Sequence, residues 1–83
     1  MSNPQLLNEP IIVKALLNGE QLYPETVRWQ NRSYQVISIG RQWLDEQGTH
    51  VLLEVHDGSR MEVVLGHNLA WRLRYYWPTG TTV

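Results

Sequence analysis

The clearest structural signal in this chain is the run THVLLEVHDGSRMEVVL, which covers residues 49–65. In both halves of the run, apolar residues alternate with polar ones, as they do in half-buried β-strands. The halves are joined by His56-Asp57-Gly58, and a three-residue loop with glycine in the left-handed position is a frequent hairpin connection. The run therefore predicts an antiparallel hairpin that places Leu53 opposite Met61, Val51 opposite Val63 and Glu54 opposite Arg60.

Further strands are predicted on the N-terminal side of this hairpin. Runs of β-branched and aromatic residues bounded by turn residues mark them, and they cover residues 11–16, 26–29 and 33–39. The expected turns are Asn18-Gly19 and Asn31-Arg32. A two-residue turn at Asn31-Arg32 would place Trp29 opposite Tyr34, which is a favourable aromatic pair.

The strand over residues 33–39 contains a change of face. Val36 and Ile37 are both apolar, and a strand that buries successive residues needs a β-bulge or cover on both sides. Gly40 follows directly and is a candidate for a sharp bend. The sequence therefore predicts that this strand curls.

Residues 70–77 form the last predicted strand, after a turn at Gly66-His67-Asn68. Strict alternation would give this strand one apolar face and one face that carries arginine. The apolar face would hold Trp71, Leu73, Tyr75 and Trp77, and the other face would hold Arg72, Arg74 and Tyr76.

These elements predict an all-β fold, a small antiparallel meander of five to six strands. So few residues cannot build two complete sheets, and we expect one sheet strongly bent into an SH3-like or half-open barrel. The predicted organisation is a flexible N-terminal arm (1–10), a single β domain (11–77) and a flexible C-terminal tail (78–83). The expected core consists of Trp29, Tyr34, Val36, Val51, Leu53, Val63, Trp71 and Leu73.

Composition narrows the class of protein. A chain of 83 residues forms one domain with a thin core. It has no cysteine, which excludes disulfides and thiolate ligands and favours a reducing cytoplasm. We see no leader and no apolar run near the roughly 20 residues that span a bilayer, so we expect a cytoplasmic protein with no membrane contact. The net charge of −1 does not point to a polyanion partner.

Catalytic and metal-binding motifs are not found in the sequence. The serines lack the strained elbow of a nucleophile, and no glycine-rich phosphate loop occurs. We expect His50, His56 and His67 to be solvated surface residues, too far apart along their strands to share a metal ion. We therefore predict a non-enzymatic protein with no catalytic residue, no metal site and no cofactor.

Arginine is the distinctive residue type, because six of the seven basic residues are Arg. The ordinary explanation is that they pair with cross-strand carboxylates such as Glu54 and Glu62. The alternative is a basic strand face with stacking aromatics, as in small β-domains that bind single-stranded nucleic acid. Exposed aromatics would instead mark a protein interface. The candidate binding residues are Arg28, Arg41, Trp43, Arg72, Arg74, Tyr76 and Trp77.

Several short motifs also resemble a family of short bacterial domains of unknown function. They are Glu9-Pro10, Val27-x-Trp29 with Tyr34-x-Val36, Arg41-x-Trp43 and Trp71-Arg72-Leu73. The family shows an opening Glu-Pro, a Trp-x-Gly-x-x-Tyr-like hairpin, a downstream Arg-Trp and a closing Trp-Arg-Leu. Asn31 stands where that hairpin favours Gly. The resemblance covers residues 9–77 and implies a fold but no activity.

The favoured function is a protein-interaction or accessory β domain, as a monomer or weak homodimer with an unknown protein partner. The first alternative is a nucleic-acid-binding module that uses the arginine and aromatic strand face. A small enzyme or a metal-binding protein is the least favoured reading of the sequence.

Overall fold

The computed structural model describes residues 5–79, which form one antiparallel sheet of seven strands. The strands are β1 (Gln5–Pro10), β2 (Ile12–Asn18), β3 (Gln21–Trp29), β4 (Arg32–Asp45), β5 (Gly48–Val55), β6 (Arg60–Leu65) and β7 (Trp71–Trp77). Strands β2 to β7 lie side by side in sequence order, and β1 pairs with the free side of β7. The predicted all-β meander is confirmed, but with seven strands rather than five or six.

The additional strand is β1, which lies in the segment expected to be an arm. It pairs with β7 through contacts such as Leu6 opposite Tyr75. Residues 1–4 of the expected arm and 80–83 of the expected tail lie outside the described residues. Strands β1 and β2 are the two edges of the sheet, joined along the chain through Ile11. No ladder pairs these edges within residues 5–79, so the sheet is not closed into a barrel.

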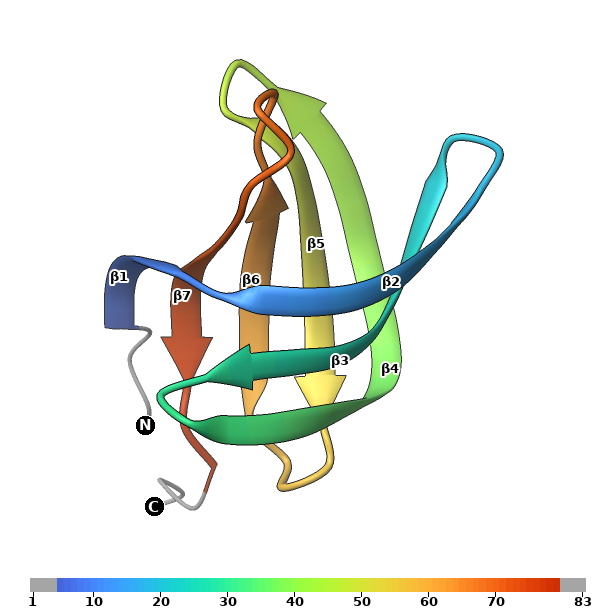
Figure 1. Ribbon diagram of the computed structural model, residues 1–83. Coiled ribbons are helices and arrows are strands. Elements are labelled where there is room, and N and C mark those ends of the chain that lie inside the picture. The colour runs from blue at the N-terminus through green and yellow to red at the C-terminus, as the bar shows by residue number, and fades with distance from the viewer. Residues whose placement is uncertain (1–4, 80–83) are drawn as a thin grey trace.

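Strand β4 takes part in both halves of the sheet and bends between them (Figure 1). Residues 32–35 pair with β3, whereas residues 36–45 pair with β5. The register shifts between Val36 and Ser38 and again between Ile39 and Gln42, the interval that contains Gly40. The predicted change of face therefore occurs through β-bulges. The bend divides the sheet into two layers. The small layer consists of β2, β3 and residues 32–35, and it crosses the main layer of β1, β7, β6, β5 and residues 36–45.

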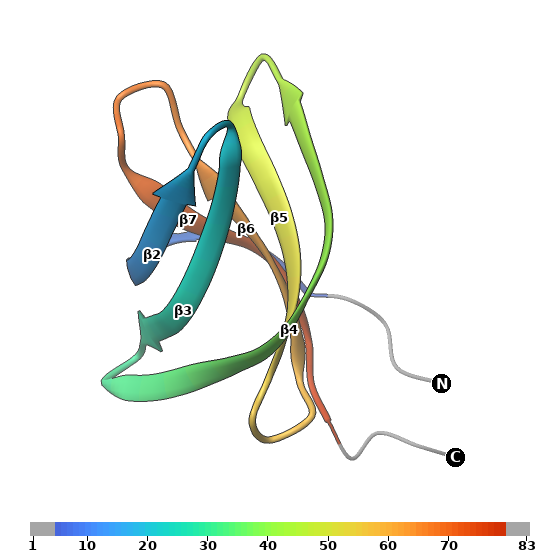
Figure 2. The same ribbon diagram turned by 90° about the vertical axis from the view of Figure 1, so that its right-hand side faces the viewer.

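The hydrophobic core lies between the two layers, where β2 and β3 cross β5 and β6 (Figures 1 and 2). Of the predicted core residues, Val36 and Trp71 are only partly buried against it. The other six are buried as expected, and they are Trp29, Tyr34, Val51, Leu53, Val63 and Leu73. The described residues contain no helix that is long and apolar enough to cross a membrane.

The hairpin of β5 and β6 has the predicted register, with Leu53 opposite Met61 and Gly58 at a φ of 87°. The predicted register of β3 and β4 is wrong. Their turn is Gln30-Asn31, at φ 53° and 62°, and Tyr34 lies opposite Val27. A two-residue turn of this kind needs two successive left-handed residues. Asn31 takes the second of these positions instead of the first.

The predicted faces of β7 are also wrong, because the strand has a bulge. Tyr75 lies opposite Glu62 while Leu73 lies opposite the next residue, Val63, so Arg74 is the additional residue. The bulge turns Tyr76 toward the core. Tyr75 and Trp77 consequently point to the opposite face, on the same side as Arg72.

Gly48 allows a close approach between the start of β5 and the end of β6. Its φ is 134°, and a Cβ there would lie 2.1 Å from the carbonyl oxygen of Leu65. We expect Gly48→Ala to lower the free energy of unfolding by about 2 kcal/mol. Urea denaturation measures this, with Gly40→Ala as control because the added Cβ would meet Leu52 at an ordinary 3.6 Å. Equal stability of the two variants would contradict this explanation.

Candidate functional site

The candidate site is the face of the main layer that points away from the small layer (Figure 2). Among residues 5–79, no strand lies over this face, which we call the outer face. Its side chains are ordered in cross-strand rows set by the registers of β4 to β7. The rows are Trp43, His50, Val64 and Arg72; Leu52, Glu62 and Tyr75; and Ser38, Glu54, Arg60 and Trp77.

A buried histidine belongs to the first of these rows. His50 is only 3% exposed, so the expectation of a solvated surface histidine is wrong for this residue. Its Nε2 lies 2.8 Å from Asp45 Oδ1, and its Nδ1 lies 2.9 Å from Glu62 Oε2. The ring of Trp43 stacks on it at 4.8 Å with an interplanar angle of 8°. Burial is tolerated because both ring nitrogens have partners.

The contact with His50 determines where the Glu62 carboxylate is directed. The His50 ring is held between Asp45 and Glu62, with one carboxylate oxygen at each ring nitrogen. Glu62 Oε2 is therefore directed at His50, and among residues 5–79 Glu62 forms no ion pair with an arginine.

The contact with His50 also makes the stability of the fold depend on the ionisation of Asp45. The hydrogen bond with His50 is the main cause that lowers the pKa of Asp45 below its ordinary value of 3.8. A lowered folded-state pKa gives stability that is present above the ordinary value and is lost as the pH falls through the lowered one. We expect Asp45→Asn to reduce this acid-induced loss in pH-dependent urea denaturation. Glu46→Gln, an exposed neighbour, should follow the wild type, and identical pH profiles for Asp45→Asn and wild type would contradict the assignment.

The arginines do not pair with carboxylates among the described residues, where the ion pairs are those of His50. The expected pairing of Arg with Glu54 and Glu62 is therefore wrong for this part of the chain. Arg41 lies instead over the ring of Trp43 at 5.0 Å, and Arg74 lies 5.7 Å from the ring centre of Tyr75.

Aromatic rings share the outer face with these arginines. Trp43, Tyr75 and Trp77 are half-buried, and the rings of Tyr75 and Trp77 are 5.9 Å apart. Sequence reasoning missed Tyr75 and Arg60 as site residues. The β7 bulge, which alternation does not reveal, places Tyr75 here. Arg60 could have been placed on this face from its predicted pairing with Glu54.

Of the predicted binding residues, the fold brings five to the outer face: Arg41, Trp43, Arg72, Arg74 and Trp77. Arg28 is separate from them, exposed on β3 in the small layer. Tyr76 is also separate, because it packs on Trp29 with ring centres 4.9 Å apart and its hydroxyl lies 3.3 Å from Ser59 Oγ. The outer face therefore contains five of the seven predicted binding residues, together with Tyr75 and Arg60, which were not predicted.

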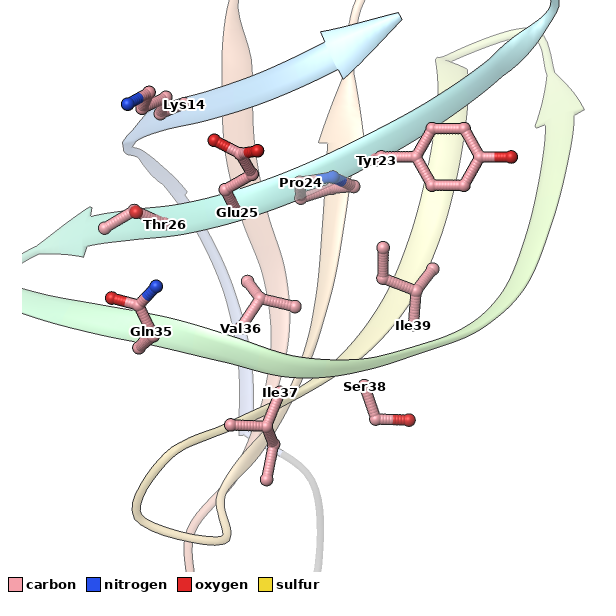
Figure 3. A pocket seen from close by; sticks show the side chains of 10 residues that line it. All are labelled: Lys14, Tyr23, Pro24, Glu25, Thr26, Gln35, Val36, Ile37, Ser38 and Ile39. Carbon is pink, nitrogen blue, oxygen red and sulfur yellow. The ribbon is translucent and has the colours of Figure 1, made fainter. Parts of the chain in front are cut away.

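A hollow of about 720 Å³ lies where β3 and β4 diverge (Figure 3). Val36 and Ile39 point into the gap between the strands, and Ile37 points away from it. At the end of the gap the Gln42 side chain bonds both backbone groups of Leu22, at 2.9 and 3.0 Å. The Gln42 amide thus replaces a missing backbone pair. We assign this hollow a structural origin in the bend of β4.

No cluster of three or more His, Asp or Glu able to hold a metal ion occurs within residues 5–79. No protein-family description, curated protein or solved structure matches this chain. The resemblance to a family of short bacterial domains of unknown function therefore stays a prediction. A function is therefore inferred from the residues of the outer face.

Proposed function

We propose that this protein is a non-enzymatic binding domain whose outer face binds single-stranded nucleic acid. One observation carries the proposal: arginines that have no carboxylate partner among residues 5–79 lie beside half-buried aromatic rings, on a sheet face that no described strand covers. Arg41 and Arg74 contact the rings of Trp43 and Tyr75 directly. Guanidinium groups bind phosphate oxygens, and aromatic rings stack on unpaired bases.

The charge distribution supports this proposal despite the net charge of −1. Arg41, Arg60, Arg72 and Arg74 belong to the outer face or reach it. Two of the nearby carboxylates, those of Asp45 and Glu62, are occupied by His50. The third carboxylate of this face is Glu54, which lies opposite Arg60. Four arginines and three carboxylates leave the local balance positive, although the whole chain is slightly acidic.

A single strand fits this face better than a duplex. In a duplex the flat faces of the bases are stacked on one another and are not accessible to aromatic side chains. Stacking is tolerant of sequence because every base has a flat face. The proposal therefore predicts weak sequence preference and a preference for single strands.

Fluorescence anisotropy with a labelled single-stranded oligonucleotide tests the proposal. Three phosphate contacts would weaken the affinity by about 100-fold between about 30 mM and about 300 mM salt, since contacts to phosphates release counterions. A duplex of the same length serves as the matched control and should bind more weakly. No binding at the lower salt concentration, or binding independent of salt, would overturn the proposal.

A second candidate function, protein interaction, is favoured by the free edge of β2. This strand is an edge of the sheet, and Ile12, Leu16 and Leu17 are 70%, 58% and 69% exposed. The β2–β3 hairpin also projects from the rest of the molecule (Figure 1). An exposed apolar edge strand can pair with an extended segment of another protein.

The chemistry of β2 indicates which occupant fits. Lys14 is the charged residue of this strand. In an antiparallel dimer, the register that places Ile12 opposite Leu16 also places Lys14 opposite its own copy, which is unfavourable. The better occupant is an extended partner segment with an acidic residue between apolar ones.

Sedimentation equilibrium and a peptide titration test this second function. We expect a monomer at about 0.5 mM, a concentration that reveals weak association. A peptide of alternating Val and Glu should shift the amide resonances of β2, and Leu16→Lys should abolish those shifts. A dimer, or a peptide that leaves the β2 resonances unchanged, would contradict this occupant.

A further inference from the structure

A hollow of about 520 Å³ lies beside the outer face, between β1, β7 and the loops that precede β5 and β7. Six polar residues contribute to its lining: Asn8, Gln47, His67, Asn68, Arg72 and Arg74. Among residues 5–79, no Asp or Glu contributes to its lining. The hollow is therefore rich in hydrogen-bond donors and lacks anionic acceptors.

The guanidinium of Arg72 is held in place on the β1 side of the hollow. Its Nε donates to Asn8 Oδ1 at 2.8 Å, and its Nη2 donates to the backbone oxygen of Asn8. Asn8 is at the irregular part of β1 and has a φ of 63°, a conformation that Asn tolerates better than most residues. These contacts leave other N–H groups of Arg72 available to a ligand.

The loop before β7 is also fixed in position. Asn68 Oδ1 accepts a hydrogen bond from the backbone N–H of Ala70 at 3.2 Å, so the amide NH2 of Asn68 remains available as a donor. His67 Nε2 lies 3.1 Å from the backbone oxygen of Glu46 and donates to it, since a carbonyl only accepts. This bond ties the loop to the turn that contains Gln47.

Donors from several elements that converge without a carboxylate match an anion with several oxygens. Arginine forms bidentate bonds to planar or tetrahedral oxyanions, and Arg74 has no carboxylate partner among the described residues. A phosphate group offers acceptor oxygens toward both β7 and the loop. A carboxylate presents fewer oxygens and would leave more of these donors unpaired.

We infer that this hollow is a phosphate-binding subsite, which receives one phosphate group of a strand lying on the outer face. The inference rests on the proposed function and deepens it. Arg72 and Arg74 bind the phosphate, and Asn68 supplies a neutral donor from the loop. The adjoining Tyr75 and Trp77 would then stack on bases of the same strand.

Amide NMR with inorganic phosphate as the probe tests this inference on the full chain. At constant ionic strength, with chloride as control, we expect shifts confined to residues 66–74 and to Asn8, saturating with a Kd in the millimolar range, about 1–10 mM. Arg74→Gln should weaken phosphate binding about tenfold. Arg28→Gln, which removes an exposed arginine from the small layer, is the matched control and should leave it unchanged. Asn68→Ala gives a second variant if Arg74→Gln does not fold.

A single-stranded oligonucleotide is then titrated into the same proteins. Loss of affinity with Arg74→Gln but not with Arg28→Gln supports the subsite. If the oligonucleotide binds near Trp43 and Trp77 but phosphate causes no localised shift, the subsite is overturned and the proposed function stands. If phosphate binds here but the oligonucleotide does not bind, the nucleic-acid function is overturned and the phosphate site stands. Equal losses in both arginine variants would mean that only net charge matters, which overturns the subsite.

Discussion

Replacing Trp29 with Ala should lower the free energy of unfolding by about 3–5 kcal/mol, a typical cost for removing a buried Trp. Trp29 is 7% exposed and connects the two layers. Its ring packs edge-on against Tyr76 of β7 at 4.9 Å and lies 6.2 Å from Tyr34 of β4. Its indole Nε1–H donates to Glu9 Oε1 of β1 at 2.9 Å. The variant would lose a large part of the total stability, which is about 5–15 kcal/mol for ordinary domains.

Urea denaturation measures this loss, and Trp29→Phe separates its two causes. Phe keeps a ring against Tyr76 and Tyr34 but cannot donate to Glu9. Because Glu9 is half-buried and can turn to water, we expect Phe to cost less than Ala, about 1–2 kcal/mol. A loss below about 1 kcal/mol for Trp29→Ala would contradict its role as the connection between layers.

Replacing Tyr75 and Trp77 together with Leu should weaken single-stranded oligonucleotide binding by about 100-fold or more. Each base stacked on an aromatic ring contributes about 1–3 kcal/mol. Both rings belong to the outer face, where Tyr75 also contacts the guanidinium of Arg74. Leu preserves apolar cover over the neighbouring strands but offers no flat ring to a base.

Fluorescence anisotropy with the double variant measures this effect. Tyr23→Leu is the matched control, because it removes an exposed ring from β3 in the small layer. An amide NMR spectrum establishes that both variants are folded before affinities are compared. An affinity of the double variant within about threefold of wild type would exclude stacking by these two rings.

The parts of the fold that the sequence predicts are those where two local signals agree. In residues 49–65 the alternation of both halves and the glycine loop specify the same register, and the structure has that register. The turn after Trp29 carries a weaker signal, since Asn31 suits either left-handed position of a two-residue turn. The strand pairing decides between them, and the resulting register differs from the predicted one.

The residues that alternation misplaced are those next to bulges. WRLRYYW reads as a regular strand, and nothing within it marks Arg74 as an additional residue. The extra residue is defined by pairing with β6, so it changes the faces of Tyr75 and Tyr76 without a local signal. Strand β1 is hidden for a related reason, because its irregular pairing with β7 breaks the period of its apolar residues.

The contact between His50 and Glu62 could have been found from the sequence. The predicted register of the long hairpin places Leu52 opposite Glu62, which puts Glu62 diagonal to His50 on one face. Diagonal neighbours on adjacent strands are within reach of long side chains. Asp45 could not be placed in the same way, since its contact depends on the two-residue turn between β4 and β5.

The central claim is that the outer face binds single-stranded nucleic acid, and an amide NMR titration of the labelled domain tests it most directly. A short single-stranded oligonucleotide is added at about 30 mM and at about 300 mM salt, since phosphate contacts weaken as salt rises. The account predicts shifts along Trp43, Arg72, Arg74, Tyr75 and Trp77 that fade at the higher concentration. An unchanged spectrum at the lower concentration, or shifts confined to β2 and β3, would contradict it.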